Sequence, residues 1–378
     1  MIYFDNAATT KIYSETLEFM KEYSENNFYN PSALYTPALK ILNDLKTAKE
    51  DLKNLLNFKS GKVVFTASAT EANNFALRCF APKNKKILVS SGEHSCVYQT
   101  SQHLKEQGYE VDYILLNEDG TINLEDLNKK LTPNTGFVSV IHVSNENGSI
   151  NDLKKVSKLI KQKCPQALLH SDGVQAFCKI DVNLTDLGVD LYTVSSHKVH
   201  GPRGVGALVF NSKLNPKPLI FGGGQEYNLR SGTENSAAIL GFLCSAKKMH
   251  QDLALNYQHL SELKQSLLKE IEELNPVING SLNNCSPAIL SVSFVGIKGE
   301  VLVRMLDEKD MYVSTGSSCN SKHSGNRVML AMGKNKQQEA GNIRISFCEQ
   351  NTQEEVIAFC EELKKNVKKI RELNIWKK

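Results

Sequence analysis

Between residues 62 and 195, short β-prone runs alternate with amphipathic helical stretches, and this alternation constrains the fold more than any other feature. The candidate strands cover residues 62–66, 87–90, 111–115, 137–143, 167–171 and 191–195. Helical periodicity fills most of the gaps between them, notably over residues 70–79, 95–107 and 152–162. Alternation of this kind favours a largely parallel sheet with helices on both faces. Ligands of such sheets bind beyond the carboxyl ends of the strands.

The chain also carries a second, smaller pattern, which predicts a second domain. A long amphipathic helix over residues 38–56 precedes the alternating region. After the alternating region, a further helical region covers residues from about 235 to 274. Further candidate strands follow at residues 289–294, 312–314 and 343–347. We therefore expect an α/β protein with a large domain over residues 14–255. A smaller α+β domain would combine residues 1–13 and 256–378.

Composition excludes several classes of protein. The chain has 378 residues and a net charge of +4, and no apolar stretch approaches the roughly 20 residues that span a bilayer. The N-terminal residues have neither the basic nor the apolar region of a signal peptide, so we expect a cytoplasmic protein. Seven Lys/Arg against three Asp/Glu between Glu361 and Lys378 account for the whole net charge. This pattern is typical of a solvated helix, so we expect no direct nucleic-acid binding; docking of an acidic protein stays open.

The nine cysteines form no C-x-x-C pair, which excludes the usual zinc-ribbon and thioredoxin signatures. We therefore expect no metal site and mostly reduced, buried thiols. Cys319 differs, because it lies in the middle of the polar run Ser314–Gly325. Exposed reactive cysteines occur in such surroundings, whereas structural ones are buried among apolar residues.

The run Ser195-Ser196-His197-Lys198 follows an apolar strand and precedes a glycine-rich turn. A lysine at the end of a buried strand can lose its solvation, and a desolvated amine can form a Schiff base with an aldehyde. An ordinary surface lysine is the alternative. The residues of this stretch alone leave both interpretations open.

Polar residues follow several other candidate strands. Ala69 and Thr70 begin a helix directly after a strand, where free backbone N–H groups can bind phosphate. Asp172 could meet a buried cationic nitrogen, with Gln175 about one turn further on. Each of these also has an ordinary explanation as a cap or turn residue. His94 follows another strand and could stack on an aromatic ring, whereas a histidine inside the apolar strand at residue 142 is typical of a protein core.

Taken together, these motifs resemble the cysteine desulfurase branch of the class V aminotransferase superfamily. The pattern S-S-H-K-x-x-G-P-x-G-x-G at residues 195–206 carries the resemblance, which runs from Tyr3–Thr10 to Arg344–Ser346. It implies a fold type I enzyme in which Lys198 holds pyridoxal 5'-phosphate covalently. The cofactor-binding residues implied are Ala69, Thr70, His94, Asn145, Asp172, Gln175, Ser195, His197, Lys198 and Thr233.

The same resemblance implies the reaction and its partners. L-cysteine would give L-alanine, and its sulfur would pass to Cys319 as a persulfide for iron–sulfur or thio-cofactor synthesis. The catalytic residues implied are Lys198, Cys319 and His94, and the substrate-binding residues are Asn30, Asn145 and Arg344. Because the segment with Thr233 resembles one that reaches into a neighbouring subunit, a homodimer with a shared active site is implied. A sulfur acceptor or an iron–sulfur scaffold protein is a further possible partner.

Some residues depart from the pattern of the family. Tyr35 replaces a common histidine, Ser144 replaces a common asparagine, and a proline expected near Asn326 is missing. These departures leave the cofactor residues in place, and the choice of partner stays open. A class V aminotransferase, or a related lyase such as selenocysteine lyase, would need Lys198 and Arg344 but would make no persulfide. A non-catalytic protein that docks through its basic tail is a third alternative.

Overall fold

A computed structural model describes residues 1–316 and 326–373 of the chain. Cys319 therefore lies outside the described residues. Within them, the main sheet has seven strands in the order β2-β8-β7-β6-β5-β3-β4. Their bounds are Gly61–Thr66 (β2), Lys86–Ser90 (β3), Val111–Ile114 (β4), Thr135–Ser139 (β5), Leu168–Asp172 (β6), Leu191–Ser195 (β7) and Gly206–Asn211 (β8). Strand β8 is antiparallel to both of its neighbours and the remaining pairs are parallel, so the predicted largely parallel sheet is confirmed.

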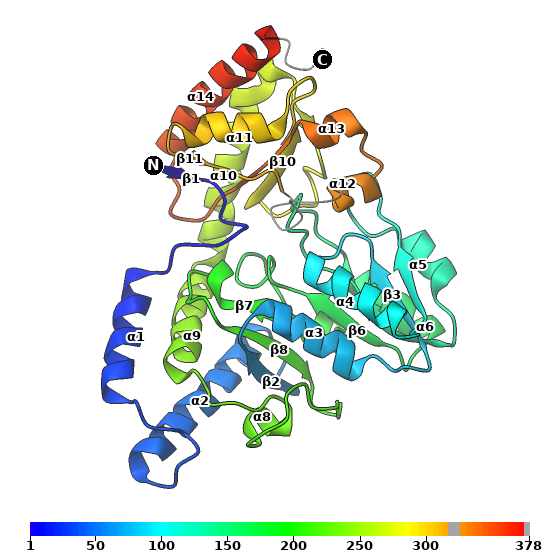
Figure 1. Cartoon of the computed structure of the whole chain (residues 1–378), viewed down its shortest axis with the longest axis vertical. Coiled ribbons are helices and arrows are strands. Elements are labelled where there is room, and N and C mark those ends of the chain that lie inside the picture. The colour runs from blue at the N-terminus through cyan, green and yellow to red at the C-terminus, as the bar shows by residue number, and fades with distance from the viewer. Residues whose placement is uncertain (317–325, 374–378) are drawn as a thin grey trace.

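Helices cover both faces of this sheet (Figure 1). The helices of the first part of the chain are α1 (Ser14–Asn26), α2 (Thr36–Leu55), α3 (Ala69–Phe80), α4 (Ser95–Glu106), α5 (Leu124–Lys130), α6 (Leu153–Lys163), α7 (Leu184–Leu187), α8 (Gln225–Asn228) and α9 (Ser236–Gln251). A three-residue helix, η1 (Ser196–Lys198), follows β7 directly. It places Lys198 just beyond the carboxyl end of a central strand.

Alternating side chains of the strands enter two separate cores. On β2, Val63 packs in the core that contains residues of α2, α6 and α9, whereas Val64 packs in the core with α3 and α4. Likewise Leu88 on β3 belongs to the first core, and its neighbour Val89 belongs to the second. Successive side chains of a strand point to opposite faces, so a strand that is apolar at every position fits a sheet covered on both sides.

A second unit with its own core lies above the main sheet in Figure 1. Its elements are α10 (Leu253–Ile271), η2 (Glu272–Leu274), β9 (Val277–Ile278), β10 (Ile289–Ser293), α11 (Gly299–Asp307), β11 (Met311–Tyr312), α12 (Arg327–Ala331), α13 (Lys336–Ala340), β12 (Asn342–Ser346) and α14 (Gln353–Glu372). Strands β12, β10 and β9 form an antiparallel sheet. The apolar side chains of α10, α11 and α14 pack on it. The division of the chain near residue 255 stays a prediction.

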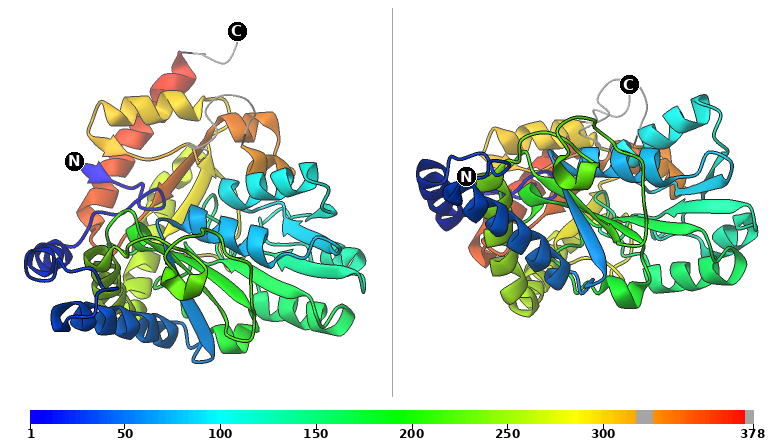
Figure 2. Two further views of the ribbon diagram at one scale, coloured as in Figure 1. Left: turned by 60° about the horizontal axis from the view of Figure 1, so that its bottom comes forward. Right: turned by 90° about the horizontal axis from the view of Figure 1, so that it is seen from below.

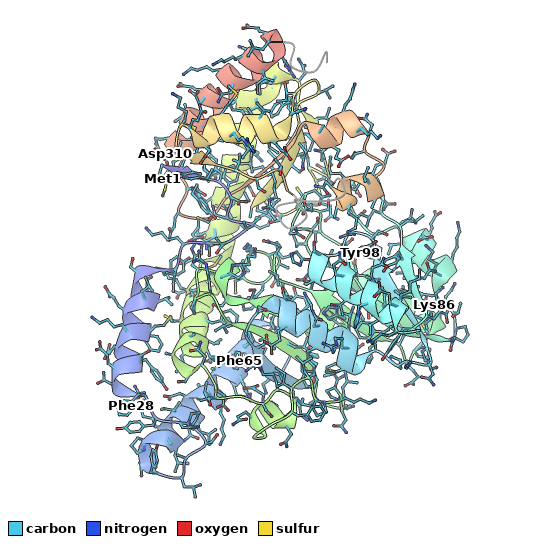
Figure 3. All side chains as sticks on the ribbon, in the orientation of Figure 1. Met1, Phe28, Phe65, Lys86, Tyr98 and Asp310 are labelled. Carbon is cyan, nitrogen blue, oxygen red and sulfur yellow. The ribbon has the colours of Figure 1, made fainter. Side chains whose placement is uncertain are left out.

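The N-terminal arm connects the two units (Figures 1 and 2). Strand β1 (Ile2–Tyr3) pairs in parallel with β11, and Met1 and Asp310 therefore lie close together in Figure 3. Phe4 is fully buried in the core of the smaller unit. The arm then crosses to the Lys198 turn, where the Thr10 hydroxyl donates to the carbonyl of His197 at 3.0 Å. Residues at the start of the chain thus lie against the turn that holds Lys198.

The predicted helical region of about 235–274 is present and consists mainly of two helices, α9 and α10, which meet at Asp252. A single continuous helix would have to extend from the first core into the core of the smaller unit. The break at Asp252 lets α9 and α10 each bury an apolar face in its own core. The predicted strand 137–143 ends at Ser139 as β5, although His142 still donates a backbone hydrogen bond to the carbonyl of Asp172. No helix in residues 1–316 and 326–373 is long and apolar enough to cross a membrane.

His142 is a core histidine, as predicted. Its contact with a neighbouring side chain allows a test of the packing of the main sheet. Its Nδ1 lies 2.8 Å from the hydroxyl of Tyr192, and burial lowers its pKa to about 4. Tyr192→Phe removes the partner of a buried polar group, so we expect the free energy of unfolding to fall by about 1–3 kcal/mol. Denaturant unfolding measures this loss.

The control for this substitution is Tyr257→Phe, because Tyr257 is an exposed residue of α10. It should leave the unfolding free energy unchanged. Equal stability of the two variants would contradict a satisfied hydrogen bond between Tyr192 and His142.

Candidate active site

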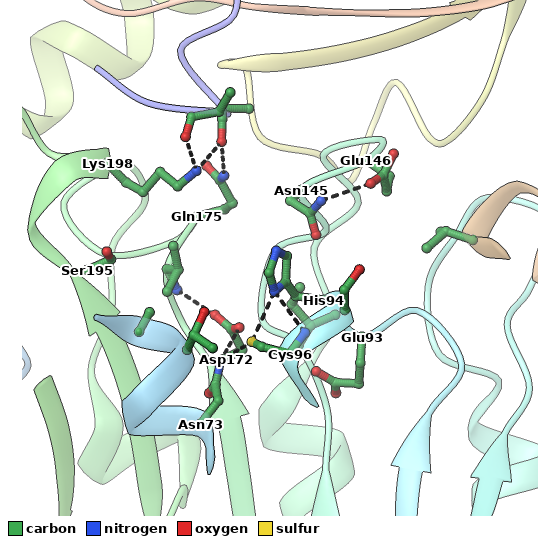
Figure 4. Close-up of a pocket in the computed structure, with 18 of the residues that line it drawn as sticks. Asn73, Glu93, His94, Cys96, Asn145, Glu146, Asp172, Gln175, Ser195 and Lys198 are labelled. Atoms are coloured by element: carbon green, nitrogen blue, oxygen red, sulfur yellow. Dashed lines mark hydrogen bonds between the residues drawn. The ribbon is translucent and has the colours of Figure 1, made fainter. Parts of the chain in front are cut away.

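A pocket of about 300 Å³ opens beyond the carboxyl ends of the central strands (Figure 4). It brings together most of the residues that the sequence analysis singled out. The predicted residues on its wall are Ala69, Thr70, His94, Asn145, Asp172, Gln175, Ser195, His197, Lys198 and Arg344. They come from the turns after β2, β3, β6 and β7, from the segment beyond β5, and from β12 of the smaller unit. A pocket of this size suits a small cofactor with part of a substrate.

Lys198 lies in the pocket wall at the end of η1. Its amine donates to the carbonyls of Ala7 and Ala8 in the N-terminal arm, at 2.5 and 2.6 Å. Burial lowers the pKa of Lys198 to about 7, and the nearby charges of Lys179 and Arg344 add to this effect. An amine with this pKa is substantially unprotonated near neutral pH, and the unprotonated form is the nucleophile.

Asp172 ends β6 and is buried at the base of the pocket. One carboxylate oxygen accepts the backbone N–H of Val174 at 3.0 Å, and the other accepts from Nδ2 of Asn73 at 2.7 Å. Asn73 lies three residues after Thr70 on α3, which places both on one face of the helix. The two hydrogen bonds fix the carboxylate where a cationic ring nitrogen would need an anionic partner.

His94 is the residue that precedes the first turn of α4. Its Nδ1 accepts the backbone N–H of Cys96 at 3.2 Å and lies 3.0 Å from the sulfur of that residue. Burial lowers the pKa of His94 below its usual value, and the charge of Asp172 acts in the opposite direction. His94 is therefore a largely neutral imidazole on the wall of the pocket.

The turn between β2 and α3 has the features of a phosphate site. The first N–H groups of a helix have no partner within it, and Ala69 and Thr70, the first two residues of α3, line the pocket. A Cβ on Gly206 would come within 2.6 Å of the nitrogen of Ala69, so β8 packs closely behind this turn. Arg230 forms an ion pair with Glu71 in the first turn of α3, with Nε and Oε1 at 2.7 Å.

Arg344 lies on β12 of the smaller unit, and its side chain lines the pocket. Its side chain is almost fully buried, and it donates to Asp5 and to the carbonyl of Asn145, both at 2.8 Å. Its Nε has no hydrogen-bond partner among the described residues. A buried guanidinium with spare donors is suited to bind a carboxylate.

Gln175 is held by a second buried amine. Its Oε1 accepts from Nζ of Lys179 at 2.9 Å, and its Nε2 donates to the carbonyl of Ala7 at 2.9 Å. Because a lysine can only donate, the amide orientation of Gln175 is fixed. Its NH2 group therefore lies on the side of Ala7 and Lys198.

Three predicted residues are not on the wall of this pocket. Asn30 and Thr233 are exposed in the single chain, and Cys319 lies outside the described residues. The roles that the sequence analysis gave to all three stay predictions. Gly316 and Asn326, which flank the segment with Cys319, do line the pocket.

The sequence analysis missed several residues of the pocket. Among them are Cys96 and Asn73, described above, and Glu93, a buried carboxyl whose pKa is raised well above its usual value by burial and by Asp172. Arg327 is a fourth. It lies at the start of α12, stacks 4.1 Å over the ring of Tyr98, and donates to backbone carbonyls of the turn before His94. No spacing in the sequence indicated Arg327, because its partners lie more than 200 residues away.

Comparison with known proteins agrees with this geometry. The family model for aminotransferase class-V matches residues 2–359. A cysteine desulfurase IscS of Clostridium botulinum is 34% identical over 99% of this chain and 96% of its own length. A solved structure titled as a NifS-like protein is 33% identical, covers 98% of both chains and has a TM-score of 0.90. Another, titled SspA in complex with cysteine, is 29% identical over 93% of this chain and 100% of its own, with a TM-score of 0.81.

The chain belongs to the class-V aminotransferase family, as one of its cysteine desulfurases. The cysteine desulfurases use pyridoxal phosphate, and the residues of this pocket fit that cofactor. The partly deprotonated amine of Lys198 would suit the aldehyde, and the carboxylate of Asp172 would suit the ring nitrogen. The open N–H groups of Ala69 and Thr70 suit the phosphate, and the oriented amide of Gln175 suits the ring hydroxyl.

The pKa of Lys198 predicts how fast this cysteine desulfurase takes up its cofactor. When apo-enzyme is mixed with pyridoxal phosphate, the rate of covalent attachment should rise with pH, because the unprotonated amine is the reactive form. The rise should be half complete near pH 7 and level off above about pH 8. Borohydride reduction at timed intervals, followed by mass spectrometry of the peptide with Lys198, measures the rate.

Lys198→Ala is the control and should give no reducible linkage at any pH. A rate in the native enzyme that keeps rising to about pH 10, as for a solvated lysine, would contradict a buried amine of lowered pKa.

Proposed function

We propose that the chain removes sulfur from L-cysteine by transfer to the thiol of Cys319, with release of L-alanine. The observation that carries this proposal is that Gly316 and Asn326 both line the pocket. The described residues on either side of residues 317–325 therefore belong to the pocket wall. Cys319 is three residues from Gly316 in the sequence, and we propose that it acts on a substrate bound in this pocket.

The thiol of Cys96 is unsuited to accept sulfur, and this supports the choice of Cys319 as the acceptor. Among the described residues, Cys96 is the one cysteine on the pocket wall. Burial and the charge of Asp172 raise the pKa of Cys96 to about 12. The thiolate is the nucleophilic form, so this thiol is nearly inert at neutral pH. A cysteine on a separate polar segment is better suited to accept sulfur.

Arg344 would bind the carboxylate of L-cysteine. Its guanidinium is held in place by Asp5, and its Nε is buried without a partner among the described residues. Asn145, whose carbonyl accepts from the same guanidinium, would lie beside the bound substrate. These contacts would place the α-carbon of the substrate near the amine of Lys198.

The bound pyridoxal phosphate supplies an aldehyde for the substrate amine and a ring that takes up electrons from the α-carbon. The amine of Lys198, with a pKa of about 7, can accept the α-proton and return it, because both of its protonation states are populated near neutral pH. Asp172 would keep the ring nitrogen protonated. Neutral His94 would donate a hydrogen bond from its N–H group within the site.

In the sulfur step, the thiolate of Cys319 would attack the sulfur of the substrate. An S–S bond forms and the Cβ–S bond breaks, with its electron pair left on the substrate carbon. That carbon takes up a proton, so one L-cysteine and one thiol give one L-alanine and one persulfide. The persulfide would then pass to an acceptor protein for iron–sulfur or thio-cofactor synthesis, and the whole sequence would take place in the cytoplasm.

We further propose that the active enzyme is a homodimer. Phe28, Leu34 and Phe221 are 73, 92 and 82% exposed in the single chain. Exposed apolar side chains of this size are typical of an interface between subunits. The ion pair of Arg230 with Glu71 holds the segment before Thr233 next to the phosphate turn of its own chain. Thr233 itself is exposed and does not line that pocket, and it would complete the phosphate site of the partner.

Cys319→Ser tests the acceptor. A serine keeps the polarity and nearly the size of cysteine, so folding and cofactor attachment should survive. A hydroxyl is scarcely ionised at neutral pH, and we expect the rate of alanine formation from L-cysteine to fall by at least about 100-fold. The substrate should still bind, which a change in the cofactor absorbance on mixing with L-cysteine would report.

Cys244→Ser is the matched control for this substitution, because Cys244 lies on α9 away from the pocket. It should retain the native rate. Alanine production at the native rate by Cys319→Ser would remove Cys319 as the acceptor. Release of a keto acid in place of alanine would favour the aminotransferase alternative.

Mixed dimers test the role of Thr233. Lys198→Ala and Thr233→Ala homodimers should each have little activity, because every site lacks one of the two residues. Hybrid dimers contain one site with both residues, so mixing and refolding the two variants should restore up to about a quarter of the native activity. The fraction follows from random pairing and one complete site per hybrid.

Activity of a monomer at working concentration, measured with its mass by light scattering, would contradict the shared site. So would mixed samples no more active than the separate variants, provided that mass spectrometry shows hybrid dimers to be present.

A further inference from the structure

Cys96 has a position that the sulfur-transfer reaction does not explain. Its thiol lies in the pocket, and its high pKa makes it a poor nucleophile. Yet its sulfur lies 3.0 Å from Nδ1 of His94 and accepts a hydrogen bond from Nδ2 of Asn73 at 3.1 Å. Asn73 also donates to Asp172. Cys96 therefore links the base of the pocket to the imidazole (Figure 4).

The contacts at Nδ1 of His94 determine which nitrogen carries the proton. The backbone N–H of Cys96 can only donate, and it points at Nδ1 at 3.2 Å. Nδ1 of neutral His94 must therefore be unprotonated, and the proton must lie on Nε2. It follows that the thiol of Cys96 is also a donor to Nδ1, and its remaining lone pairs can accept from Asn73. The thiol and the backbone N–H of Cys96 then share Nδ1 as their acceptor, and Oδ1 of Asn73 is left without a partner among the described residues.

Helix α4 favours the same state. His94 occupies the N-cap position of α4 and uses Nδ1 as the capping acceptor, a role that requires the neutral ring. The positive end of the helix dipole disfavours a cation at this position. The ring nitrogen that does not contact Cys96 points toward the open part of the pocket in Figure 4.

We propose that Cys96 is a positioning residue that holds His94 as the neutral imidazole protonated at Nε2. His94 then presents an N–H to the pocket and acts as a hydrogen-bond donor there; with Nε2 already protonated, it cannot accept a proton at that atom. This inference rests on the proposed function only for the place of His94 beside the substrate. It adds which nitrogen faces the pocket, that this nitrogen donates, and that the thiol of Cys96 supports this state beside the backbone N–H.

Several charged groups lie near His94 and affect its pKa. These groups are Asp172 on β6, which favours the cation, and Lys198 on η1, Arg327 on α12 and Arg344 on β12, which disfavour it. None of them contacts Nδ1 in the described residues. Their effects are therefore shared by variants that differ only at residue 96, and a comparison of such variants isolates the contact with the thiol.

The test compares three enzymes with cofactor bound and without substrate. Cys96→Ser keeps a donor at this position, and Cys96→Val replaces it by an apolar group of similar size. Nitrogen-15 NMR of histidine-labelled protein reports the protonated nitrogen, and the signal of His94 is assigned by its loss in His94→Gln. We expect the proton on Nε2 in the native enzyme and in Cys96→Ser.

In Cys96→Val, the midpoint of the His94 titration should rise by about half a pH unit, since the neutral ring loses one donor to Nδ1. Cys96→Ala serves as a second variant without a donor, in case the branched side chain disturbs α4, and should shift in the same direction.

A proton on Nδ1 in the native enzyme would overturn the inference. So would equal midpoints in the native, serine and valine or alanine enzymes. Because no substrate is present and sulfur transfer is not measured, failure here is distinct from failure of Cys319 as the acceptor, which the alanine assay detects.

Discussion

The burial of one amine is the constraint on which the arrangement of this protein depends. Lys198 must lie in the pocket with its amine partly unprotonated. Burial is required for this, because contact with water would raise the pKa of the amine to its ordinary value. The carbonyls of Ala7 and Ala8 provide two acceptors without a negative charge, so the amine is held but its cation is not strongly stabilised. A carboxylate in their place would raise the pKa and remove the nucleophile.

This requirement accounts for the path of the N-terminal arm. The two carbonyls come from residues about 190 positions before the lysine, and they reach it because β1 and Phe4 anchor the arm in the smaller unit. Asp5 on the same arm holds Arg344. The arm thus joins the cofactor lysine to the arginine proposed for the substrate, and displacement of the smaller unit would disturb both.

Much of the site could be predicted because parallel strands end at one edge of a sheet. Lys198 and Asp172 follow neighbouring strands, so local strand patterns were sufficient to bring them together. The pocket residues of the turns after β2 and β3 followed from the same rule. The antiparallel direction of β8 was not predicted, because an apolar run reads alike in both directions.

Other residues depend on contacts that no local pattern encodes. Cys96 lies two positions after His94, but its contact with the imidazole depends on where α4 begins. Arg327 reaches the turn before His94 from a helix of the smaller unit. Thr233 and Asn30 were named from a family resemblance, and both are exposed in the single chain.

The most direct test of the central claim is one turnover of the enzyme with L-cysteine. Holoenzyme is mixed with an equal amount of L-cysteine and quenched, and amino acids, keto acids and persulfide are then quantified. We expect equal amounts of L-alanine and protein persulfide, with the extra sulfur on the peptide that contains Cys319. Formation of a keto acid, or of alanine with no persulfide on Cys319, would contradict this account.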